Sequence, residues 1–212
     1  MRKIFRFCVF LVFVSITAIP CFSDCAAQLV INEFLADPAR DWDGDGALSS
    51  RDDEWVEIIN LGNAAVDLAG YRLADGEGRP VWRYGFSGVL EVGAVRVVYG
   101  SDSRAWEEAN SFPVYGLSLN NAGDRVALYR IAGTDTAIVD SYTFAEVGAR
   151  DDRAIGRRSD TPAVWVVFDA HNPCTATCVP AGSGCYPTPG SVNTCTTATE
   201  SHSWGSIKSI YR

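Results

Sequence analysis

Short runs of β-branched and aromatic residues, separated by turn-forming residues, recur from residue 29 to residue 169. Val, Ile, Tyr and Trp fit the pleated surface of a β-sheet, whereas the intervening NLGN, LNNAGD and AGTD contain residues of tight turns. This spacing predicts an all-β sandwich or barrel. The runs occupy residues 29–35, 54–60, 66–75, 94–100, 125–131, 137–144 and 163–169. A helix is predicted over residues 101–110, with Asp102 as its N-cap.

Six segments resemble the lamin tail domain in their order and spacing, and in particular the exported prokaryotic members of that family. They read VINEFLADP, DEWVEIIN, VDLAGYRL, LNNAGDRVALY, AIGR and PTPGSVN, and they extend from about Val30 to Asn193. The resemblance implies an immunoglobulin-like antiparallel β-sandwich over residues 28–193 and no enzymatic activity. It also implies an interaction module of an exported or surface protein, whose partner is an unknown protein or cell-surface component.

Two stretches depart from that family pattern: an acidic loop at residues 37–54 and a cysteine-bearing insert at residues 170–186. In the acidic loop, DWDGDG begins at Asp41, and Asp52 occupies the last of twelve positions. This is the spacing of a calcium-binding loop, with Asp in place of the final Glu. Hard cations take oxygen ligands, and alternate residues of a curled loop point inward together.

The loop therefore predicts a structural calcium ion held by Asp41, Asp43, Asp45, the carbonyl of Ala47, Ser49 and Asp52. Leu48 is expected to anchor the loop to the core. Because the loop joins two predicted strands rather than two helices, a calcium sensor is not expected. The alternatives are a solvated acidic turn with Asx hydrogen bonds, or another cation such as magnesium.

Residues 1–27 are predicted to be a signal peptide, since a basic start is followed by an apolar run and by small residues before a cleavage site at Ala27. An uncleaved anchor, or a lipid on Cys21 or Cys25, is the alternative. Removing this segment removes three basic residues and one acidic residue, and so takes the formal charge from −8 to −10. Such an acidic protein is a poor ligand for nucleic acid. We expect a secreted or cell-surface protein with no transmembrane span after cleavage.

The cysteines that remain are Cys174, Cys178, Cys185 and Cys195. An even number close together in an exported chain predicts two disulfides, with all three pairings open. A zinc site with His171 is the alternative.

Candidate catalytic groups are few. The chain has two histidines, and no serine lies in a nucleophile motif. Glu33 and Glu57 lie in strand-like runs and suggest paired carboxylates for hydrolysis. The alternative function is a small secreted metal-dependent hydrolase of nuclease or phosphatase type that uses a calcium-supported site. Trp55, Trp82 and Trp165 are expected on sheet faces, in the core or on a surface that binds carbohydrate or peptide.

Residues 194–212 are predicted to form a linker and a short tail. Trp204, Ile207 and Tyr211 are spaced to share one face of a short helix that Ser203 caps. The segment from Trp204 to Arg212 is interpreted as a docking segment, a sorting signal or a disordered end.

Overall fold

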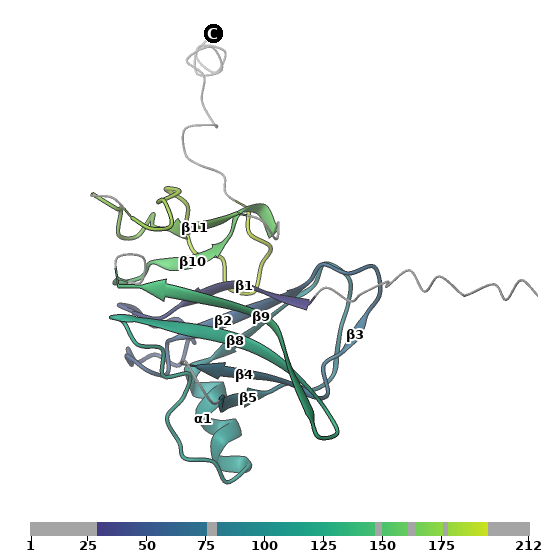
Figure 1. Ribbon diagram of the computed structural model, residues 1–212. Helices are drawn as coiled ribbons and strands as arrows, with labels where there is room; N and C mark the ends of the chain where they lie inside the picture. The colour runs from purple at the N-terminus through teal and green to yellow at the C-terminus, as the bar shows by residue number, and fades with distance from the viewer. Residues whose placement is uncertain (1–28, 76–79, 147–149, 161–163, 176–177, 195–212) are drawn as a thin grey trace, which may run out of the picture.

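Two antiparallel β-sheets pack face to face in the computed structural model, which describes residues 29–75, 80–146, 150–160, 164–175 and 178–194. The strands are β1 (Leu29–Leu35), β2 (Trp55–Asn60), β3 (Val66–Asp67), β4 (Tyr71–Asp75), β5 (Val81–Gly85), β6 (Val89–Leu90), β7 (Val95–Tyr99), β8 (Gly123–Ala132), β9 (Asp135–Ala145), β10 (Ala154–Arg157) and β11 (Trp165–Phe168). The helix α1 spans Gly100–Ala109, and a short 3-10 helix, η1, spans Arg158–Asp160. Figure 1 shows β11, β10 and β1 at the top of the view and α1 below β5.

The strand order is β11-β10-β1-β2-β7 in the larger sheet and β5-β4-β8-β9 in the smaller one, with β3 and β6 forming a separate pair. Every pairing between these strands is antiparallel. The predicted antiparallel β-sandwich is therefore confirmed. The predicted run at residues 66–75 is divided into β3 and β4, because Gly70 between them has a φ of +89° and turns the chain. Strands β5, β6 and β10 were not predicted.

A bulge at Asn32 determines which side chains of β1 face the central core. Ile31 pairs with Ile58 and Glu33 pairs with Glu57, so Asn32 is an extra residue in β1. The extra residue shifts the alternation of side chains. As a result Ile31 and Phe34 both enter the central core, while Glu33 lies on the opposite, outer face of the larger sheet.

Helix α1 packs against β5 and β7. Its start differs from the prediction, because Asp102 is the third residue of the helix rather than the N-cap. The Asp102 carboxylate accepts a hydrogen bond of 3.1 Å from the backbone N–H of Tyr99, which precedes the helix. A carboxylate in the first turn still faces the positive end of the helix dipole.

The cysteine-bearing insert follows β11. Cys174 and Cys178 form a disulfide, which supports the disulfide interpretation for these two residues over a zinc site. Cys185 is also disulfide-bonded, whereas Cys195 lies outside the described residues. The predicted signal peptide and the tail from residue 195 lie outside them as well. In the described part of the chain, every helix is too short or too polar to cross a membrane.

Candidate functional site

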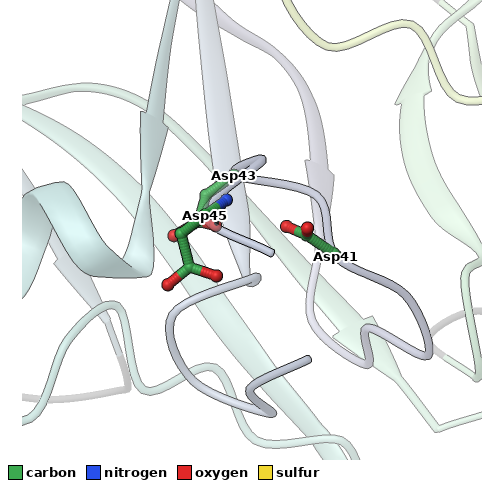
Figure 2. A group of neighbouring side chains, drawn as sticks. All are labelled: Asp41, Asp43 and Asp45. Atoms are coloured by element: carbon green, nitrogen blue, oxygen red, sulfur yellow. Dashed lines mark hydrogen bonds between the residues drawn. The ribbon is translucent and has the colours of Figure 1, made fainter. Parts of the chain in front are cut away.

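Three carboxylates converge in the loop between β1 and β2. One oxygen each of Asp41, Asp43 and Asp45 lies within 4.8 Å of the other two. Figure 2 shows Asp41 on one side of the loop, pointing toward Asp43 and Asp45. All three groups offer hard oxygen ligands, which calcium prefers. The structure therefore brings together half of the six ligands that the sequence predicts.

Hydrogen bonds within the loop give it this curled shape. Asp41 accepts from the N–H of Gly44 at 2.8 Å and from the N–H of Gly46 at 2.9 Å. Asp43 accepts from the N–H of Asp45 at 3.1 Å. Gly44 and Gly46 have φ of +78° and +92°, which residues with a Cβ rarely adopt. Because a carboxylate oxygen has two lone pairs, these bonds leave acceptor capacity for a cation.

Ala47 donates its backbone N–H to Asp45 at 2.7 Å, a bond that does not involve the carbonyl predicted as a ligand. The other two predicted ligands already have partners, since the hydroxyl of Ser49 donates to Asp52 at 3.1 Å. Both oxygens of Asp52 also bind Arg104 of α1, at 2.8 and 2.9 Å. Asp52 thus faces a cationic side chain, and its role as a calcium ligand, like those of Ala47 and Ser49, stays a prediction.

Asp53 closes the loop from inside. Its side chain is fully buried. One oxygen accepts from the N–H groups of Trp42 and Asp43, at 2.5 and 3.1 Å, and the other accepts from the N–H of Ser49 at 2.7 Å. The sequence analysis did not predict this role, because the calcium-loop pattern assigns its twelfth position to Asp52. The one indication in the sequence is that Asp53 lies just before a strand of apolar residues.

Trp42, rather than Leu48, attaches the loop to the body of the domain. The ring of Trp42 packs against that of Trp55 with a centroid distance of 6.0 Å, and its indole N–H donates to Asp152 at 2.8 Å. The predicted anchor Leu48 is 59% exposed, so that prediction was wrong. The physical reason is that Asp53 and Trp42 fill the inner side of the loop, which leaves Leu48 on the outside.

Asp152, which precedes β10, ties the loop to the end of the larger sheet. Besides the indole of Trp42, it binds the N–H of Ala39 at 2.9 Å and the guanidinium of Arg40 at 2.9 Å. Burial acts to raise the pKa of Asp152, but these hydrogen bonds and the charge of Arg40 outweigh it and lower the pKa below its usual value of 3.8. Asp152 is therefore a negatively charged anchor at neutral pH.

The other end of the loop packs on α1 so closely that only glycine fits at residue 100. A Cβ added to Gly100 would lie 1.7 Å from the carbonyl oxygen of Arg51. We expect Gly100→Ala to lower the free energy of unfolding by about 2–3 kcal/mol, because backbone must move to relieve the overlap. Urea denaturation measures this. Ser101→Ala, one residue further along the helix, is the control, and an equal loss in both variants would contradict the steric explanation.

A second group of carboxylates lies on the outer face of the larger sheet, under a C-terminal strap that we define as residues 188–194. Glu33 binds the hydroxyl of Thr188 at 2.8 Å, and Glu57 accepts from the N–H of Gly190 at 2.7 Å. Asn193 at the end of the strap donates its N–H to Asp160 at 2.8 Å. Both glutamates are fully buried, although strand alternation places them on an outer face.

Burial changes the titration of these groups. Desolvation raises the pKa of Glu33 well above 4.5, and the nearby charge of Glu57 raises it further. Desolvation likewise raises the pKa of Glu57 to about 7 and that of Glu54, which precedes β2, to about 8. The Glu33 and Glu57 carboxylates hold the strap through its N–H and hydroxyl groups. They are not open to a substrate.

The family comparison agrees with this architecture. Residues 24–146 match the family model of the lamin tail domain, which is more than half of the chain. The match ends after β9, so β10, β11 and the strap lie beyond it even though β10 pairs with β1. A search of curated proteins found no match. The chain belongs to the lamin tail domain family.

Proposed function

We propose that this protein is an exported, non-catalytic interaction module whose loop from Asp41 to Asp53 holds a structural calcium ion. The observation that carries the proposal is the convergence of three carboxylates in a loop that its own hydrogen bonds already shape. Asp41, Asp43 and Asp45 would hold the ion. The ion would neutralise their mutual repulsion and stiffen the connection between β1 and β2.

The nearby arginines do not neutralise the three carboxylates. Arg40 binds Asp152, and Arg104 binds Asp52. Unit charges about 4–5 Å apart near a protein surface repel by a few kcal/mol at an effective dielectric constant of about 20. A divalent cation among the three would convert this repulsion into attraction. Since the loop joins two strands, a bound ion has no helix pair to open, and its role is structural.

Export is supported by the disulfide between Cys174 and Cys178, because disulfides persist in oxidising compartments. The basic and apolar start of the chain is consistent with it. The partner in this proposal is a protein or another component of the cell surface.

A non-catalytic role is supported by the immunoglobulin-like fold of the family. The alternative is a small metal-dependent hydrolase with a calcium-supported site, for which Glu33 and Glu57 were the candidate pair of carboxylates. These carboxylates bind the strap instead, at Thr188 and Gly190. A substrate would have to displace the strap to reach them, so no observation favours the hydrolase.

The calcium proposal is tested by calorimetric titration and by thermal melts with calcium or with a chelator. Calcium at about 100 times its dissociation constant should stabilise the domain by about 2.7 kcal/mol. For a domain of this size that corresponds to a rise in melting temperature of about 5–11 °C. Identical melting curves with millimolar calcium and with chelator would overturn the proposal.

A matched pair of variants makes the test specific to the loop. Asp43→Asn and Asp45→Asn should each weaken calcium binding at least about tenfold, because each removes one charged ligand. Asp67→Asn is the control, since Asp67 is also exposed and also accepts a hydrogen bond from the N–H two residues ahead, at Ala69. An equal effect of Asp67→Asn would mean that calcium acts through net charge and not through the loop.

A further inference from the structure

An apolar groove runs over the outer face of the smaller sheet, away from the calcium loop. It has a volume of about 760 Å³. Its walls are mainly apolar and come from β5, β8, β9 and the loop after α1: Pro80, Val81, Trp82, Phe112, Tyr129 and Ile138. A hollow lined in this way is a surface suited to apolar side chains.

Packing beneath the groove holds its aromatic walls in place. Trp82 and Tyr129 meet edge to face with a centroid distance of 5.3 Å, and both pack on Ala74 and Ala127. Yet Val81 and Ile138 at the rim are 50% and 51% exposed. The groove is thus preformed, and its rim presents aliphatic side chains to solvent.

The chain itself contains a segment with matching chemistry. Residues 204–212 combine Trp204, Ile207 and Tyr211 at helical spacing with two basic side chains and no acidic one. The domain from residue 29 to residue 194 carries 24 acidic and 13 basic residues, a net charge of −11. Charge therefore favours contact between the two. A helix of this length is marginal alone in water, so its apolar face requires a surface.

The end of the described chain lies within reach of the groove. Asn193 donates to the carbonyl of Arg157 at 2.7 Å, and the Arg157 guanidinium binds Asp140 of β9 at 2.6 Å. Ile138 in the groove wall is two residues from Asp140 along the same strand. Figure 1 shows β9 running beside β1, against which it packs. The nine residues from 195 to 203 can span up to about 30 Å, which is enough to bring residue 204 to this side of the groove.

We propose that residues 204–212 dock into this groove of the same molecule, with Trp204, Ile207 and Tyr211 against its apolar walls. The docked segment covers the exposed rim at Val81 and Ile138. Its basic side chains, Lys208 and Arg212, stay at the surface of the acidic domain. The proposal does not depend on calcium binding.

Photo-cross-linking tests the location directly. The purified protein, expressed from the full coding sequence, carries benzoylphenylalanine in place of Ile207. After irradiation, mass spectrometry should find cross-links to the β5 and β9 peptides that contain Val81 and Ile138. An equal mixture of isotopically heavy and light protein should give cross-links within one copy only. Cross-links to other parts of the domain, cross-links between copies, or none at all would each overturn the proposal.

Proteolysis of the full chain gives a second, independent measurement. Ile138→Asp should increase the rate of trypsin cleavage after Lys208 by about tenfold, because a charge in the groove releases the segment. Val92→Asp is the matched control, since Val92 is 52% exposed and lies in the turn before β7, away from the groove. Equal cleavage rates in the two variants would overturn the proposal. Val81→Asp, also on the groove rim, serves the same test if Ile138→Asp does not fold.

Discussion

Replacing Asp53 by Ala is expected to lower the free energy of unfolding by about 3–4 kcal/mol. The buried carboxylate accepts hydrogen bonds from the N–H groups of Trp42, Asp43 and Ser49. Without it these donors lose their acceptor, and each unsatisfied group costs about 1–3 kcal/mol when water cannot reach it. The three residues that donate these bonds are half-buried, so water reaches them in part and we expect a total near the low end of the range of about 3–9 kcal/mol that three such groups allow. Urea denaturation followed by circular dichroism measures the loss.

Two further variants separate this effect from general loss of charge. Asp53→Asn keeps one carbonyl oxygen and should lie between wild type and Asp53→Ala. Asp67→Ala removes an exposed carboxylate that accepts one N–H, and it should cost less than about 1 kcal/mol. Asp53→Ala should also weaken calcium binding, because it removes the bonds that hold the loop closed around Asp43. If Asp53→Ala is as stable as wild type, the loop does not depend on Asp53.

Stability should rise as the pH falls from 8.5 to 5.5, by about 3–5 kcal/mol. The pKa of Glu54 is about 8 and that of Glu57 about 7, whereas both are near 4.5 in the unfolded chain. The folded state therefore binds protons more tightly at these groups. The stability they contribute is fully present below about pH 4.5 and is lost as the pH rises through about 7 to 8.

Two other groups, His171 and Asp152, have pKa values that folding lowers instead of raising. Burial lowers the pKa of His171 from 6.5, which subtracts from the gain below that pH. The lowered pKa of Asp152 contributes stability that is lost only as the pH falls below about 3.8, outside the measured range. We therefore expect the buried glutamates to determine the direction in which the free energy of unfolding changes between pH 5.5 and pH 8.5.

Urea denaturation at a series of pH values, with chelator present throughout, measures this dependence separately from calcium. Glu54→Gln and Glu57→Gln should each reduce the slope, because the amide does not titrate. Glu91→Gln is the control, since Glu91 is exposed in the turn before β7, and it should leave the slope unchanged. A wild-type stability that is constant or rises toward pH 8.5 would contradict the prediction.

Local sequence determined the sandwich and the acidic loop. The predicted run at residues 29–35 coincides with β1, and those at 54–60, 94–100, 125–131, 137–144 and 163–169 differ from their strands by at most two residues at either end. Alternating apolar residues and turn formers act over a few residues, so they can be recognised without the fold. The same holds for Asp41, Asp43 and Asp45, whose carboxylates accept hydrogen bonds from N–H groups two to five positions further along the chain.

Only the tertiary structure decided which carboxylates are buried and what they bind. Glu33 meets Thr188, 155 residues further along the chain, and Glu57 meets Gly190, 133 residues away. Asp52 is paired with Arg104 of α1. The neighbouring Asp53 instead accepts the hydrogen bonds from the backbone N–H groups of Trp42, Asp43 and Ser49 that keep the loop closed. The burial of a carboxylate depends on which distant segment covers it, and alternation along a strand carries no information about that cover. From the sequence, Glu33 and Glu57 are therefore expected to be an accessible pair of carboxylates. In the folded chain the strap at residues 188–194 covers both and hydrogen-bonds to them.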